Sequence, residues 1–83
     1  MKTQIEQLKE FHAAFNLPMR DEPVLIPKGE FLLRHAILIE EVEEILTAYR
    51  QRDIVEVADG IIDSMYVLIG TAIQFGLSIN FVM

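Results

Sequence analysis

Apolar residues recur along most of this chain at spacings of three and four, which is the repeat of one face of an α-helix. The pattern predicts three helices, over about residues 4–15, 30–51 and 54–75. It nowhere changes to the strict alternation that is typical of a half-buried strand. The predicted class is therefore all-α, a helical bundle built around an antiparallel hairpin of the second and third helices.

Residues that cap helices stand at the predicted boundaries. Thr3 with Glu6, and Asp53 with Glu56, form the capping-box pattern before the first and third helices. Gly76 is the expected stop of the third helix, because glycine readily takes the left-handed conformation that ends helices. The turn between the second and third helices is then only about two residues long.

Three prolines interrupt the helical pattern between the first and second helices. They are Pro18, Pro23 and Pro27, and Gly29 is expected to end the interruption. We predict an ordered connection over residues 16–28, because its apolar side chains have to pack.

The length of 83 residues predicts one small domain, residues 1–83. Of these residues 52% are hydrophobic, whereas a domain of this size hides its apolar surface poorly when alone. We therefore expect a homo-oligomer, either a dimer or a tetramer. Ser78 is positioned to cap a fourth helix, of which the chain holds barely one turn.

Charge and composition narrow the possible partners. A net charge of -6 argues against binding to a nucleic-acid backbone, although a nucleotide held through metal ions stays possible. The chain has no cysteine, so it can form neither a disulfide nor a thiolate site. The first residues lack a signal-peptide core, and the longest uncharged run, 64–83, is broken by polar residues. These features favour a cytoplasmic protein that does not span a membrane.

Two acidic clusters carry the strongest chemical signal. Their members recur at spacings of three and four, so each cluster lies largely on one face of its helix. The second helix carries Glu40, Glu41 and Glu44, and the third carries Glu56, Asp59 and Asp63. Because the rest of the third helix is almost wholly apolar, we expect it to be buried nearly all round, with its acids inside the bundle.

The position of each acid relative to the turn predicts which carboxylates meet. At about 1.5 Å per residue, Glu41, Glu44, Asp59 and Asp63 lie at similar levels, and Glu56 lies nearer the turn. Unpaired carboxylates at one site repel one another. A hard divalent cation, Mg²⁺ or Mn²⁺, would neutralise them, activate water and hold phosphates. Glu40 is the candidate catalytic carboxylate that orients or deprotonates that water.

These residues resemble the all-α nucleoside triphosphate pyrophosphohydrolases, the MazG-like and phosphoribosyl-ATP pyrophosphohydrolase-like proteins. The family pattern is Glu-Glu-x-x-Glu on one helix, followed by Glu-x-x-Asp on the next. Glu40 to Glu44 matches its first half, and residues 56–76 and 11–18 are similar to one branch of the family over longer stretches. The resemblance implies Mg²⁺-dependent cleavage of an NTP or dNTP to the monophosphate and pyrophosphate, by subunits that pair through a helical core.

The chain departs from the family pattern in two places. The family's metal-binding Asp usually precedes the helix-ending Gly by about the separation of Asp63 from Gly76. In that register Gly60 occupies the usual Glu position, and Asp59 or Glu56 has to substitute, whereas Glu56 and Asp59 themselves match the literal Glu-x-x-Asp spacing. Family members also continue into a fourth helix that contacts the phosphates, and this sequence contains little of it.

Each candidate also has a purely structural interpretation. The cluster at residues 40–44 also fits a solvated helix face, and Glu56 fits a capping partner of Asp53. Asp59 and Asp63 could pair with Arg34 or Arg50. The substrate-binding candidates could instead be core, cap or packing residues, and they are His12, Phe15, Asn16 and Tyr66.

The function best supported by the sequence is a metal-dependent nucleotide pyrophosphohydrolase, an enzyme of nucleotide-pool house-cleaning or a related task. One alternative is a non-catalytic helical dimerisation or regulatory module with an incomplete site. Another is a binding partner whose acidic face recognises a basic protein. The sequence leaves open which base and sugar the substrate carries. It also leaves open how many metal ions bind and whether the chain forms a dimer or a tetramer.

Overall fold

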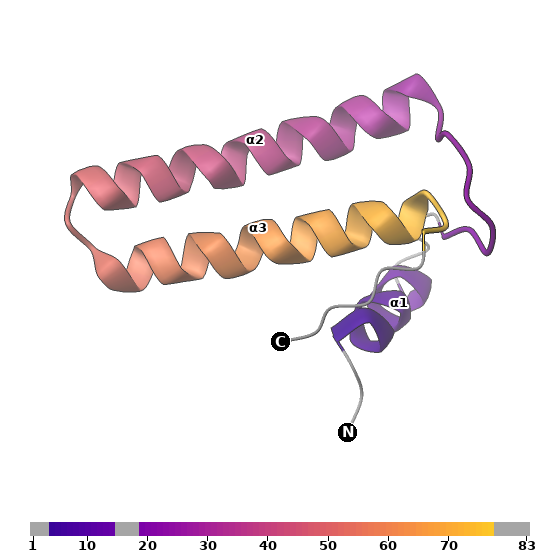
Figure 1. Ribbon diagram of the computed structural model, residues 1–83, viewed down its shortest axis with the longest axis horizontal. Helices are drawn as coiled ribbons and strands as arrows, with labels where there is room; N and C mark the ends of the chain where they lie inside the picture. The colour runs from indigo at the N-terminus through magenta and orange to yellow at the C-terminus, as the bar shows by residue number, and fades with distance from the viewer. Residues whose placement is uncertain (1–3, 15–18, 78–83) are drawn as a thin grey trace. The chain divides into compact units, whose positions relative to one another are not determined.

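The computed structural model describes residues 4–14 and 19–77, and it contains three helices in these ranges. They are α1 (Gln4–Ala14), α2 (Lys28–Arg50) and α3 (Ile54–Gln74) (Figure 1). No strand occurs within the described residues, so the predicted all-α class is confirmed. In the same part of the chain, no helix combines the length and apolar character that crossing a membrane requires.

The chain divides into two compact units. One contains Met1–Ile26 and Ile69–Met83, and the other contains Pro27–Leu68. The second unit holds α2 and most of α3, which pack against each other as an antiparallel hairpin (Figure 1). We refer to this unit as the hairpin.

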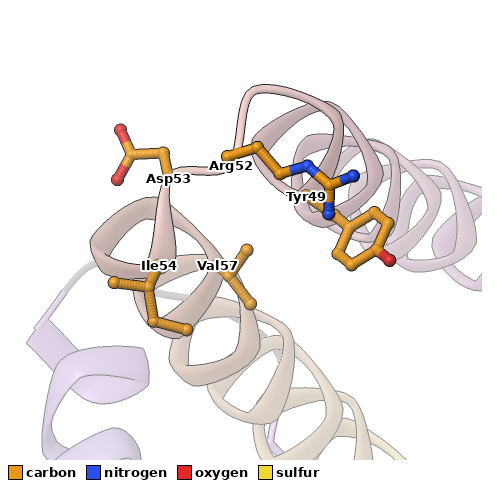
Figure 2. Close-up of a pocket in the computed structure, with 5 residues that line it drawn as sticks. All are labelled: Tyr49, Arg52, Asp53, Ile54 and Val57. Atoms are coloured by element: carbon orange, nitrogen blue, oxygen red, sulfur yellow. The ribbon is translucent and has the colours of Figure 1, made fainter.

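A tight turn joins α2 to α3. The N–H of Asp53 donates to the carbonyl of Ala48 and that of Arg52 to the carbonyl of Tyr49, both at 3.0 Å. These two bonds form a Schellman motif, in which Arg52 takes the left-handed conformation with φ 59°. Its guanidinium lies 5.4 Å from the centre of the Tyr49 ring (Figure 2). Asp53 Oδ1 accepts the Glu56 N–H at 3.1 Å, so the predicted cap of the third helix is confirmed.

The carboxyl end of α3 also closes as predicted. Gly76 has φ 72°, and the N–H of Leu77 donates to the carbonyl of Ala72 at 2.9 Å. A Cβ at position 76 would collide with the carbonyl of Glu22, so only glycine fits there.

The described part of the connection before α2 is ordered against the end of α3. Val24 donates its N–H to the carbonyl of Phe75 at 2.9 Å, and Arg20 Nη1 donates to the carbonyl of Gln74 at 2.8 Å. The start of α2 differs from the prediction, since the helix begins at Lys28 rather than Glu30. Pro27 precedes it with an extended ψ of 149°, and its carbonyl accepts the first helical bond, from the N–H of Phe31 at 3.0 Å.

Small residues mark where α2 and α3 meet. The buried or half-buried residues on the facing sides of the two helices include Arg34, Glu41, Ile45 and Ala48 on α2 and Val57, Gly60, Ser64 and Val67 on α3. We call these two sets the contact rows. A Cβ built at Gly60 would lie 2.6 Å from Cγ1 of Ile45, which shows how close the helices are at this level. Nearer the open end, Arg34 Nη2 crosses to the carbonyl of Val67 at 2.9 Å.

The expectation that the third helix is buried nearly all round, with its acids inside the bundle, is wrong for the single chain, in which Glu56, Asp59 and Asp63 are all exposed. Ile54 is 76% exposed and Val55 65%, and Ile61 and Ile62 are each about half exposed. The physical reason is that α2 covers only one side of α3 within the hairpin, the side of its small residues. The large apolar side chains point elsewhere.

The Gly60 contact predicts a direct effect of added volume on stability. Gly60→Ala is expected to destabilise the fold by about 1–2 kcal/mol, because the clash with Ile45 exceeds the gain in helix propensity. Gly29→Ala is the matched control, since nothing lies within 4 Å of a Cβ at that position. The control is expected to be neutral or to stabilise by up to about 1 kcal/mol. Urea unfolding of both variants measures the difference, and equal stability would contradict the tight contact.

Candidate functional site

A pocket of about 200 Å³ lies between the two helices of the hairpin and is walled largely by carboxylates. Its lining consists of Glu44, Thr47, Ala48 and Gln51 from α2 and Glu56, Asp59, Gly60 and Asp63 from α3. Four of the five predicted metal-binding residues therefore line one hollow.

The register of α3 explains why its acids share this pocket. Glu56, Asp59 and Asp63 each precede by one residue a member of the α3 contact row. One residue is a rotation of about 100°, so the three carboxylates lie on the same side of that row. On α2, Glu44 likewise precedes Ile45, and the antiparallel arrangement brings it to the same side of the hairpin.

The fifth predicted ligand, Glu41, adjoins the pocket from the contact row of α2. Its Oε2 atom is buried and has no hydrogen-bond partner. Burial raises the pKa of Glu41 above its ordinary value, and the charges of Glu44 and Asp63 raise it further, with smaller effects from a hydrogen bond to Glu44 and from Glu40. An oxygen that is buried, unpaired and surrounded by like charges is a position that a cation would stabilise.

The oxygen atoms of the predicted ligands are of the type that binds a hard divalent cation. They belong to five carboxylates on two facing helices, and Mg²⁺ and Mn²⁺ prefer such oxygen ligands. Among residues 4–14 and 19–77, however, no three acidic or histidine side chains are arranged so that they could hold one metal ion. The roles of these residues as ligands therefore stay predictions.

The other predicted site residues lie outside the pocket. Glu40 is exposed on α2, and Tyr66 is 37% exposed on α3, one turn beyond Asp63. His12 belongs to the other compact unit, where it is only 2% exposed. Phe15 and Asn16 fall outside the described residues.

Two polar pocket residues were not predicted from the sequence. Thr47 and Gln51 follow Glu44 by three and seven residues, which is the spacing of one helix face, and this signal could have identified them. One structural interpretation pairs Arg34 with an acid of α3. The Nη2 atom of Arg34 does not make that pair in the structure. That atom donates to the carbonyl of Val67 instead.

Comparison with known protein families gives a match that covers nearly the whole chain. Residues 8–83 match the family described as phosphoribosyl-ATP pyrophosphohydrolase. Comparison with curated proteins finds no match.

The raised pKa of Glu41 predicts how stability depends on pH. The folded protein resists ionisation of this carboxyl, so stability falls as pH rises from its ordinary pKa of 4.5 to the raised value. In metal-free buffer, Glu41→Gln should therefore melt at a higher temperature than the wild type at pH 7, and the difference should shrink near pH 4. Thermal melts at both pH values measure it.

Glu43→Gln is the control for this prediction, because Glu43 is exposed on the same helix and does not line the pocket. Its effect on the melting temperature should be small and the same at both pH values. A Glu41→Gln variant that is less stable than the wild type at pH 7 would contradict the repulsion inferred here.

Proposed function

The chain belongs to the phosphoribosyl-ATP pyrophosphohydrolase family, within the all-α MazG-like pyrophosphohydrolases, and we propose that it is a metal-dependent hydrolase of nucleoside triphosphates. The proposed products are the nucleoside monophosphate and pyrophosphate. The observation that carries the proposal is the pocket in which Glu44, Glu56, Asp59 and Asp63 meet from two helices.

The reaction balances with water as the only co-substrate. A water oxygen bonds to the α-phosphorus, and the bond from that phosphorus to the bridging oxygen breaks. Pyrophosphate leaves with that oxygen, and a proton from water has to be accepted. Glu40 is our candidate for the carboxylate that accepts the proton, since it adjoins Glu41 closely enough for its charge to raise the pKa of Glu41.

A triphosphate and the carboxylate pocket would repel each other without a cation between them. We propose that Glu41, Glu44, Glu56, Asp59 and Asp63 supply the ligands for Mg²⁺ or Mn²⁺. The bound cation would screen the phosphate charge and make water more acidic. The protein's own contribution is then to hold the carboxylates in place on two rigid helices.

The triphosphate is the part of the substrate that the proposal specifies. The family name points to phosphoribosyl-ATP, in which the adenine also carries a phosphoribosyl group, and the acidic motif fits plain NTPs and dNTPs equally well. All these compounds share the bond that is cleaved. A house-cleaning role would favour dNTPs or non-standard nucleotides, whereas a biosynthetic role would favour phosphoribosyl-ATP.

A second candidate function is a helical regulatory or dimerisation module without catalysis. Two observations favour it. In the register in which Asp63 is the family's metal-binding Asp, Gly60 stands at the position of the Glu, and no three acidic or histidine side chains among the described residues are arranged so that they could hold one metal ion. Such a module would keep the fold and lose the reaction.

Release of pyrophosphate is the direct test. The chain is incubated with Mg²⁺ or Mn²⁺ and a panel of phosphoribosyl-ATP, NTPs and dNTPs, and pyrophosphate is separated from orthophosphate. We expect metal-dependent pyrophosphate release, and the rates across the panel identify the substrate. Glu41→Gln and Asp63→Asn should each lower the rate about 100-fold or more, whereas Glu43→Gln should keep it. No turnover of any compound would favour the regulatory module.

Metal binding has a readout that does not depend on turnover. A ligand that binds only the folded chain adds about 2.7 kcal/mol of stability at 100 times its dissociation constant, so Mg²⁺ or Mn²⁺ should raise the melting temperature. Asp63→Asn should weaken this rise, and excess EDTA should abolish it. An unchanged melting temperature at millimolar metal, with Glu43→Gln and Asp63→Asn behaving alike, would contradict a cation site in the pocket.

A further inference from the structure

The carboxylate pocket extends in one direction from its outermost acids. Its lining on α2 runs from Glu44 to Gln51, and its lining on α3 runs from Asp63 back to Glu56. Every lining residue therefore lies between the level of Glu44 and Asp63 and the turn that joins the two helices. A ligand that fills this hollow has one end near Glu44 and Asp63 and its other end near the turn.

The two ends of the pocket differ in their need for a cation. The buried, unpaired Oε2 atom of Glu41 adjoins the end where the charges of Glu44 and Asp63 act on it. A cation is most stabilising there, and the phosphates of a nucleotide would lie with the cation. This step rests on the proposed function, and it leaves the turn end of the pocket for the nucleoside.

The neutral hydrogen-bonding side chains of the pocket lie toward that turn end. They are Thr47 and Gln51, which follow Glu44 by three and seven residues. Along the axis of α2 these steps amount to about 5 Å and about 10 Å. In a nucleotide the sugar adjoins the α-phosphate and the base lies beyond the sugar. The order from the acids to the turn is the same, with Thr47 at the level of the sugar and Gln51 at the level of the base.

The hydroxyl of Thr47 is prepared to accept a hydrogen bond. Its Oγ1 atom donates to the carbonyl of Glu43 at 3.1 Å, which uses the single proton of the hydroxyl. The lone pairs of the oxygen remain as acceptors on the pocket side. A sugar hydroxyl can donate to this oxygen, whereas an ionised phosphate oxygen has no proton to give.

Gln51 combines a fixed backbone with an open side chain. Its N–H donates to the carbonyl of Thr47 at 3.0 Å, at the point where α2 ends. Within residues 4–14 and 19–77 its carboxamide makes no hydrogen bond. A carboxamide offers two donors and an acceptor in one plane, and glutamine side chains use this pair of groups to bind the edges of bases.

We propose that Thr47 and Gln51 determine which nucleoside the pocket accepts. Thr47 accepts a hydrogen bond from a sugar hydroxyl, and the carboxamide of Gln51 binds the edge of the base. The carboxylates then serve the phosphates and their cation, and selectivity belongs to two neutral side chains on α2.

Binding of nucleotides that cannot be cleaved tests the role of Gln51. Titration calorimetry with Mg²⁺ and the α,β-methylene analogues of ATP, GTP, CTP and UTP measures a dissociation constant for each base. The wild type should prefer one base, and Gln51→Ala should reduce that preference about tenfold, which is the worth of one or two hydrogen bonds. Arg50→Ala is the matched control, because Arg50 is exposed at the neighbouring position and does not line the pocket. It should keep the wild-type order of bases.

Three results would overturn the role of Gln51. They are equal binding of all four bases by the wild type, a Gln51→Ala variant that keeps the wild-type preference, and no binding of any analogue. A loss that is the same for every base would also count against it, because it would reflect a general effect on the pocket.

The sugar contact is tested with analogues that lack one hydroxyl. Thr47→Val removes the acceptor, so it should weaken binding of the complete ribonucleotide analogue about tenfold. It should leave unchanged either the 2′-deoxy or the 3′-deoxy analogue, namely the one that lacks the recognised hydroxyl. Thr47→Ser keeps the hydroxyl and should restore binding. Equal weakening of all three analogues by Thr47→Val, or no rescue by Thr47→Ser, would overturn this contact.

These binding measurements separate the inference from the proposed hydrolysis. Base-dependent binding that Gln51→Ala abolishes, in a chain that releases no pyrophosphate, would support nucleoside recognition and reject the reaction. Pyrophosphate release with an unchanged base preference in Gln51→Ala would support the reaction and reject the recognition.

Discussion

The close approach of α2 and α3 at Gly60 is the constraint on which the rest of the hairpin depends. With no side chain at this position, Ile45 can sit against the backbone of α3, and both helices keep one orientation about their axes. That orientation sends the residues before the contact row of α3 to one side and the residues after it to the other. The carboxylate pocket and the exposed apolar side chains on the opposite side, such as Val42 and Ile61, are therefore two consequences of a single helix contact.

Both sides of the hairpin carry a cost in the stability of the single chain. On the pocket side, the raised pKa of Glu41 records first the cost of burying its carboxyl and then the cost of holding it near the charges of Glu44 and Asp63. On the other side, large apolar side chains stay in water in the single chain. A cation bound in the pocket would relieve the first cost without moving the helices apart. Proteins often accept such local destabilisation at a site where charge has a function.

The sequence predicts most of the fold because local signals agree with one another. Asp53 and Gly76 are caps whose geometry depends on residues within one turn, and both are found as predicted. The predicted start of α2 is two residues late. The extended ψ of Pro27 ends the connection just before Lys28, and Gly29, which the pattern predicts as a break, is a helical residue. The burial of α3 was wrong for a different reason. Periodicity shows that a side is apolar, but it does not show whether the cover comes from the same chain.

The candidate site was predictable in its members but not in its detailed arrangement. Counting residues from the turn brings Glu44, Asp59 and Asp63 to similar levels, since the rise per residue of a helix is fixed. Counting residues along a helix does not predict whether the carboxylate side chains turn toward a common metal position. In the structure these carboxylates do not surround such a position. Counting also missed Thr47 and Gln51, because neither residue type is diagnostic without a known pocket around it.

The contact row also limits where α3 can carry its acids. Glu56 and Asp59 have the family's Glu-x-x-Asp spacing, and the position three residues before Asp63 is Gly60. A side chain at Gly60 would meet Ile45 before it reached the pocket, so the contact and an acid at this position exclude each other. Glu56 and Asp59 line the same pocket from one turn below and from the adjacent position. The chain thus carries acidic side chains on α3 beside the contact row and uses Gly60 to bring the helices together, so an acid at position 60 would push α2 away from the carboxylates of the pocket.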